Sequence, residues 1–196
     1  APWSSQDVGS VGAPGWASFV VAGFSRLKPA TTNDGAGGRF TLRACGADIW
    51  GKADAFHFVS QPLPGDGTIV ARVESLERTD NWAKSGVMIR EGMAPGALCV
   101  FMCVTPGNGA SFQRRVTADA DTGSVKAAGI AAPYWVKLTR AGDLFTGSIS
   151  PDGEQWTKVS EVTVKMKKDV AVGLAATSHT NAATTRAVMD HVTVTR

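Results

Sequence analysis

Pairs of acidic residues are the first candidates for chemistry, because two carboxyl groups about 5–10 Å apart can hydrolyse a glycosidic bond. Glu74 and Glu77 are three positions apart, so a strand would place them on opposite faces. Asp119 and Asp121 have the correct parity, but they occupy a polar stretch that offers no apolar pocket around an acid. No acid–base pair is therefore predicted, and a divergent glycan-cleaving enzyme is the least favoured function.

Other catalytic and metal signatures are weak as well. The histidines are scattered, and no Gly-x-Ser-x-Gly motif marks a nucleophilic serine. Cys99 and Cys103 are four positions apart in a predicted strand, about 13 Å at the usual rise, which rules out a disulfide between them. Cys45 could pair with either only if the fold brings it close, and buried free thiols are the simpler expectation. No cofactor is required by any motif.

Aromatic residues favour a binding function, because a flat ring can pack against the apolar face of a sugar. The chain has six tryptophans and one tyrosine. Trp50 and Trp82 lie at the borders of predicted strands, where the loops of a sandwich meet solvent. We expect these two rings to form a binding platform. The alternative is that each ring closes one end of the core.

Strand alternation predicts polar partners for these rings. Lys84 and Arg90 share one face of a predicted strand, and Gln113 and Arg115 share one face of another. If these strands are neighbours, they form one polar surface, and the full predicted binding set is Trp50, His57, Trp82, Lys84, Arg90, Gln113, Arg115 and His179. Its clustered cations favour an acidic glycan over a neutral one. The alternative is a solvated sheet face with local ion pairs.

The elements that must position these residues are short strands separated by Gly, Pro and Asp turns. We expect strands over 53–61, 68–76, 85–90, 98–104, 111–116, 134–140, 144–149, 155–160, 170–178 and 187–195. Helical periodicity is nearly absent, and 118–132 is expected to be loop or weak strand. The pattern predicts an all-β, two-sheet antiparallel sandwich of the jelly-roll, concanavalin-A-like kind. It forms one domain over 1–196, with an extended loop or insertion within 19–40.

Composition narrows the class of partner. The net charge is only +3, and the basic residues are dispersed, so nucleic acid is not an expected partner. No apolar run approaches the ~18 residues of a membrane span. The first residues lack a charged segment followed by an apolar one, which indicates a mature terminus or an excised module. A monomer without membrane attachment is expected.

Several segments together resemble a known group of domains: 47–51 (Ala-Asp-Ile-Trp-Gly), 82–90 (Trp-Ala-Lys-Ser-Gly-Val-Met-Ile-Arg), 111–115 (Ser-Phe-Gln-Arg-Arg), 134–140 (Tyr-Trp-Val-Lys-Leu-Thr-Arg) and 177–179 (Thr-Ser-His). They are similar to concanavalin-A-like, laminin-G-like jelly rolls of the regulation-of-enolase-type group of unknown function, found in secreted bacterial multidomain proteins. The resemblance spans about 6–195. The chain departs from the group in the long stretch 20–38 and in its cysteines.

The resemblance implies a secreted, extracellular protein whose domain accompanies polysaccharide-degrading or adhesive modules. It also places a structural calcium ion at Asp7 and Asp190, where related modules tie their first and last strands together. The leading hypothesis is a non-catalytic carbohydrate-binding accessory module that takes a polysaccharide or oligosaccharide. The alternative is a structural or adhesive module whose partner is a protein or another module of the parent chain.

Overall fold

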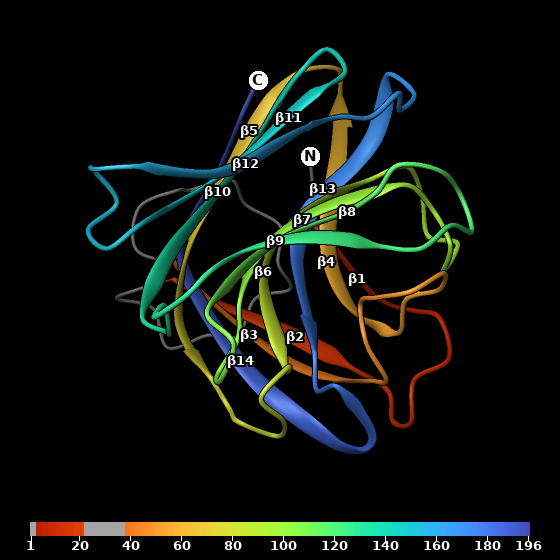
Figure 1. Cartoon of the computed structure of the whole chain (residues 1–196). Helices are drawn as coiled ribbons and strands as arrows, with labels where there is room; N and C mark the ends of the chain where they lie inside the picture. Colours follow the sequence, from red (N-terminus) through yellow and green to blue (C-terminus); the bar gives the residue numbers. More distant parts are fainter. Residues whose placement is uncertain (1–2, 22–37) are drawn as a thin grey trace.

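The computed structural model describes residues 3–21 and 38–196, in which fourteen strands form two seven-stranded antiparallel sheets. The two sheets pack face to face as a sandwich (Figure 1). The predicted fold class is therefore confirmed. Most of the insertion expected within 19–40 lies outside the described residues. The described part of the chain contains no helix that could cross a membrane.

The front sheet carries most of the residues that the sequence singled out. Its strands run in the order β1 (Ser4–Val8), β4 (Phe56–Pro64), β13 (Asp169–Thr177), β6 (Lys84–Arg90), β7 (Cys99–Val104), β8 (Ala110–Arg115) and β9 (Gly123–Ala127). Strand β9 falls within the stretch expected to be loop or weak strand. It pairs antiparallel with β8 at the edge of the sheet.

The back sheet covers the inner face of the front sheet. Its order is β12 (Thr157–Thr163), β11 (Leu144–Ser150), β10 (Tyr134–Ala141), β5 (Gly67–Leu76), β14 (Thr180–Thr195), β3 (Gly38–Gly46) and β2 (Trp16–Val21). The chain crosses between the two sheets several times, whereas β6 to β9 follow one another within the front sheet and β10 to β12 within the back sheet (Figure 1).

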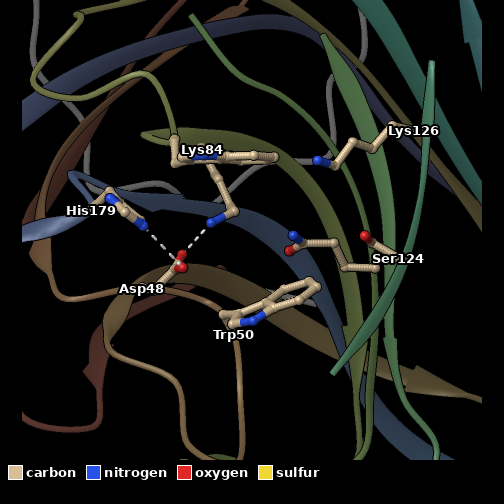
Figure 2. Close-up of a pocket in the computed structure, with 8 residues that line it drawn as sticks. Asp48, Trp50, Lys84, Ser124, Lys126 and His179 are labelled. Carbon is tan, nitrogen blue, oxygen red and sulfur yellow. Dashed lines mark hydrogen bonds and ion pairs between the residues drawn. The ribbon is translucent and has the colours of Figure 1, made fainter. Parts of the chain in front are cut away.

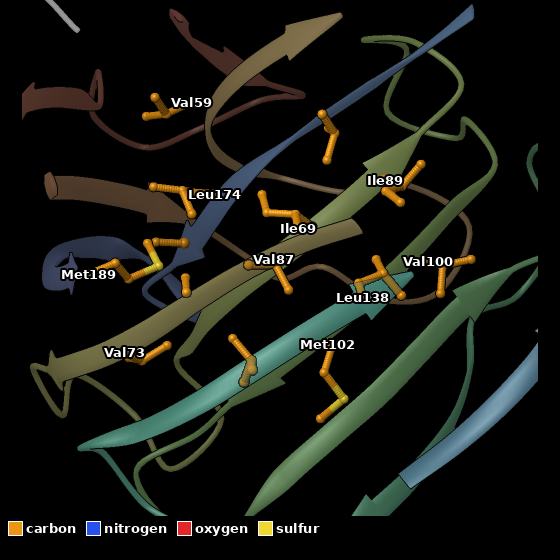
Figure 3. Packing of buried hydrophobic residues seen from close by; sticks show 14 of the residues in the cluster. Val59, Ile69, Val73, Val87, Ile89, Val100, Met102, Leu138, Leu174 and Met189 are labelled. Carbon is orange, nitrogen blue, oxygen red and sulfur yellow. The ribbon is translucent and has the colours of Figure 1, made fainter. Parts of the chain in front are cut away.

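The main core lies between the sheets and follows the predicted alternation. Val87 and Ile89 of β6 and Met102 of β7 point inward and pack against Ile69 of β5 and Leu138 of β10 (Figure 3). Each of these side chains is fully buried. Burying one such side chain stabilises a fold by about 1.5–3 kcal/mol relative to exposing it.

A second apolar cluster lies on the outer face of the front sheet, which we expected to be a mainly polar surface. Phe56 and Phe58 of β4, Met88 of β6 and Phe101 of β7 form it, and Ile49 packs onto them. Ile49 belongs to the segment 47–55, which joins β3 to β4 and which we call the covering loop. This loop leaves only part of the outer face open.

The three cysteines are buried and free, which confirms the expectation of buried free thiols. Cys99 and Cys103 both point to the outer face, among the aromatic side chains of the second cluster. Burial raises the pKa of Cys99 to about 11 and that of Cys103 to about 12. Both groups are therefore neutral thiols at physiological pH and behave as small apolar side chains.

Candidate functional site

The strand register brings several predicted side chains onto one face. Strands β6 and β8 are not direct neighbours as expected, because β7 lies between them, and β13 flanks β6 on the other side. The four strands nevertheless belong to one sheet, so their predicted polar faces lie on one surface. Lys84 starts β6 opposite Thr177 of β13. Gln113 of β8 lies beside Ser124 of β9, and Lys126 follows two residues later on the same face.

These residues line a cavity of about 480 Å³ at the open part of the outer face. Its lining consists of Asp48, Trp50, Trp82, Lys84, Gln113, Ser124, Lys126 and His179. Five of the eight were in the predicted binding set. The other three, Asp48, Ser124 and Lys126, were not, and two of them belong to β9, which sequence reasoning had treated as loop or weak strand.

One end of the cavity is a network of charged groups (Figure 2). The buried ammonium of Lys84 donates to Asp48 Oδ1. His179 lies with Nε2 at 3.2 Å from Asp48 Oδ2 and Nδ1 at 3.1 Å from Oδ1 of Asp80. Because both oxygens of Asp48 are occupied, that carboxylate holds Lys84 and His179 in place.

Two tryptophans from different loops give the cavity its apolar lining. Trp50 comes from the covering loop and is 42% exposed. Trp82 follows β5 and is half-buried. Its backbone N–H donates to Asp80 Oδ1 at 2.7 Å, which fixes the turn that carries the ring. The Nζ of Lys126 lies 4.2 Å from the centre of the Trp82 ring, a cation–π contact.

Gln113 is the least satisfied polar residue of the cavity. Its side chain is 1% exposed, and its Oε1 has no hydrogen-bond partner among the described residues. A buried polar atom left without a partner costs about 1–3 kcal/mol. A buried acceptor of this kind requires an explanation, and either an ordered water or a bound molecule can supply the missing donor.

Arg90 and Arg115 require a correction. Both point to the outer face as alternation predicted, but both are 0% exposed beneath the chain's own loops. Asp54 of the covering loop receives Arg90 Nη1 at 3.0 Å and Arg115 Nη2 at 2.6 Å. Arg115 also donates to the backbone carbonyls of Gly51 and Pro95. Neither guanidinium is available to an external ligand.

The pKa of Arg115 reflects this pairing. Burial by itself lowers that pKa, but the hydrogen bond and negative charge of Asp54 raise it overall. The guanidinium therefore stays charged in the interior and depends on Asp54 as its counterion.

His57 also lies elsewhere. In β4 it alternates with Phe56 and Phe58, so its ring points away from the outer face. Its Nδ1 is 2.7 Å from Asp7 Oδ1, and its Nε2 is 2.8 Å from Oγ of Ser5. Ser5, His57 and Asp7 are thus connected in the same sequence as in a catalytic Ser–His–Asp triad. However, His57 is only 2% exposed, so a substrate would not reach its imidazole. The chain of hydrogen bonds ties the edge strand β1 to β4.

The residues expected to hold calcium do not fit that ion. Asp7 belongs to β1 of the front sheet and is engaged by His57 and by the backbone N–H of Gly15. Asp190 belongs to β14 of the back sheet and receives two hydrogen bonds from Arg72. Each carboxylate has its own partners in a different sheet, and the described residues contain no cluster of three or more metal-ligating side chains.

Asp190 also carries a shifted pKa. Burial alone raises that pKa, but hydrogen bonds from Arg72 and His191 lower it overall. The group is thus held as an anion by the neighbouring Arg72.

The two seven-stranded antiparallel sheets define an all-β sandwich with the concanavalin-A-like fold. Comparison with solved structures agrees. A functionally unknown protein from Saccharomyces cerevisiae has a TM-score of 0.62 at 19% identity, covering 80% of this chain and 87% of that chain. The carbohydrate-binding module CBM66 from Bacillus subtilis has a TM-score of 0.54 at 14% identity, covering 79% and 86%.

A plant protein gives a third match. Lectin II from Ulex europaeus has a TM-score of 0.50 at 8% identity, covering 93% of this chain and 98% of that chain. No protein-family model matches the sequence, and no curated protein matches it. At these identities the similarity establishes the fold and leaves the ligand to be argued from the pocket.

Proposed function

We propose that the chain is a non-catalytic carbohydrate-binding module and that the cavity around Trp50 and Trp82 is its binding site. The observation that carries the proposal is the buried, unpartnered Oε1 of Gln113 in a cavity with two tryptophans. Sugars present apolar ring faces and hydroxyl groups together. A cavity of apolar walls with a few fixed polar groups is the usual form of such a site.

Each lining residue has a chemical role in this proposal. The indole rings pack against the sugar ring face. Gln113 Oε1 accepts a hydrogen bond from a sugar hydroxyl. Lys84 has three donors, of which Asp48 takes one, so the remaining donors can reach sugar oxygens. Ser124 adds a hydroxyl at the opposite side of the cavity (Figure 2).

The cavity volume sets the length of the bound segment. About 480 Å³ is within the range of small-molecule sites and accommodates a short oligosaccharide. The module would therefore hold a short stretch or an end of a polysaccharide. A site for a crystalline polymer surface would instead present a flat row of aromatic rings.

The setting of the module is part of the same proposal. The similarity to CBM66, which is named as a carbohydrate-binding module, supports this assignment of function. The resemblance to regulation-of-enolase-type domains supports a secreted, extracellular module attached to further modules of a larger protein. Within that protein it would form a single unit over 1–196 and keep the parent close to its polysaccharide.

A binding assay with matched tryptophan variants tests the proposal. The protein is run in gels containing neutral and acidic polysaccharides, and titrated by calorimetry with any that retard it. Trp82→Ala and Trp50→Ala should each weaken binding at least about tenfold, the scale of losing one well-buried aromatic contact. Trp16→Ala is the control, because Trp16 is 51% exposed on the back sheet.

The controls separate binding from folding. All three variants are first compared with the parent by circular dichroism and thermal unfolding. Binding that survives both pocket substitutions, or that is lost in Trp16→Ala, would place the site elsewhere. Absence of binding to every polysaccharide, together with specific binding of a protein partner through the same face, would replace the proposal with an adhesive function.

A further inference from the structure

The charges of the cavity are not balanced, and this imbalance points to the class of sugar. Asp48 neutralises Lys84 at one end. His179 lies between Asp48 and Asp80, so both of its ring nitrogens face carboxylates. In the described part of the chain these charged groups occupy one another. They orient a ligand, but they leave no unpaired positive charge at that end.

Lys126 is different. It is an exposed lysine on β9 at the other side of the cavity (Figure 2). Its Nζ lies 4.2 Å from the centre of the Trp82 ring, and no carboxylate of residues 3–21 or 38–196 forms an ion pair with it. The aromatic contact holds the ammonium at the cavity, while the ammonium keeps donors free for an anion.

A second Lys–Trp pair shows that this arrangement is not sufficient by itself. Lys137 Nζ lies 4.0 Å from the centre of the Trp156 ring on the outer face of the back sheet. Within residues 3–21 and 38–196, no buried, unpartnered acceptor lies in a cavity with that pair, whereas the Lys126 pair shares its cavity with Gln113. The combination of an unpaired cation and an unpaired acceptor is what distinguishes the pocket.

We infer that the pocket selects an anionic sugar, one of whose hydroxyl groups donates a hydrogen bond to Gln113 Oε1 while Lys126 binds the negative group. A uronic acid carries both features on one ring. The inference rests on the proposed function, because it names the ligand class of the same pocket. It no longer depends on Arg90 and Arg115, because both are fully buried and pair with Asp54.

Matched polymers test the inference. Polygalacturonate, alginate and hyaluronan are each compared by calorimetry with their methyl-esterified forms, in which the carboxylate is neutral and the backbone is unchanged. A sulfated galactan is the second source of negative charge. The parent should bind at least one uronate polymer about tenfold more tightly than its ester, the scale of one charge-assisted hydrogen bond.

Two charge-matched variants separate the pocket from general attraction. Lys126→Gln and Lys137→Gln each lower the net charge of +3 by one, so nonspecific attraction to a polyanion falls equally in both. Lys126→Gln should abolish the preference for acid over ester, measured as the ratio of the two dissociation constants for this variant. Lys137→Gln should retain the preference.

The outcomes distinguish the inference from the proposed function. If acid and ester bind equally, if only neutral polysaccharides bind, or if Lys126→Gln keeps the preference, the anionic ligand class is wrong while sugar binding stands. If the sulfated galactan alone binds through Lys126, the anion is a sulfate ester. If no polysaccharide binds, both ideas fail.

Discussion

The two halves of the outer face of the front sheet carry similar polar residues, but the chain covers one half and leaves the other half open. In the closed half, Arg90 and Arg115 are fully buried and both pair with Asp54. In the open half, Lys84 lies at the floor of a cavity and Gln113 has an acceptor without a partner in the described residues. A polar side chain on a sheet face can therefore contribute to a binding site only where the rest of the chain leaves it uncovered.

One loop creates both halves. The covering loop inserts Ile49 onto the second apolar cluster and lays Asp54 across the two arginines. The same loop presents Asp48 and Trp50 to the cavity. The contacts of Ile49 and Asp54 anchor this loop on the sheet. They therefore also fix the positions of Asp48 and Trp50 at the cavity. Substitutions in the two halves should separate stability from binding.

The largest expected effect belongs to Asp54→Asn. This change removes the counterion of two buried guanidinium groups, and it should lower the free energy of unfolding by about 3–5 kcal/mol. Denaturant unfolding followed by fluorescence measures the loss. Glu161→Gln is the matched control, because its ion pair with Lys158 is exposed and should be worth less than about 0.5 kcal/mol. Equal effects of the two changes would contradict the account of the closed half.

A smaller effect of opposite sign is expected at Gln113. Gln113→Met keeps the side-chain volume and removes the unpartnered acceptor, so the free energy of unfolding should rise by about 1 kcal/mol. Binding of a glycan should fall by about tenfold, because the hydrogen bond to a hydroxyl is lost. Gln155→Met, on an exposed turn, should change neither quantity. Destabilisation by Gln113→Met would show that the amide is a structural group.

A further expected result is the absence of reaction at the thiols of the folded protein. Burial raises the pKa of Cys99 beneath the closed half to about 11 and that of Cys103 beside the open half to about 12. Native protein at pH 8 should therefore react with a disulfide reagent such as dithionitrobenzoate at less than about one hundredth of the rate of urea-unfolded protein. Fast modification of Cys103 alone would show that the cavity reaches into the second cluster.

Local sequence information predicted the strands and their faces well. Strands β5, β6, β7, β8 and β10 lie within one or two residues of the expected ranges, because alternating side chains and Gly-rich turns are local signals. The stretch containing β9 was left as loop or weak strand because it is short and polar. Ser124 and Lys126 were missed with it.

The misplaced site residues have two physical explanations. His57 was placed on the wrong face, although its alternation with Phe56 and Phe58 carries the correct parity. Arg90 and Arg115 were placed on the correct face, but their burial depends on where the covering loop folds. That placement is a long-range property, since Asp54 is 61 positions from Arg115. No local pattern contains it.

The central claim is that the cavity around Trp50 and Trp82 binds the glycan. Its most direct test is to titrate ¹⁵N-labelled protein with a glycan that bound in the earlier assays and to follow the indole N–H signals of the tryptophans. Each signal is assigned by substituting its tryptophan. The account predicts that the signals of Trp50 and Trp82 shift with saturation, while those of Trp16 and Trp156 stay in place. Saturable shifts of Trp16 or Trp156, with Trp50 and Trp82 unchanged, would contradict it.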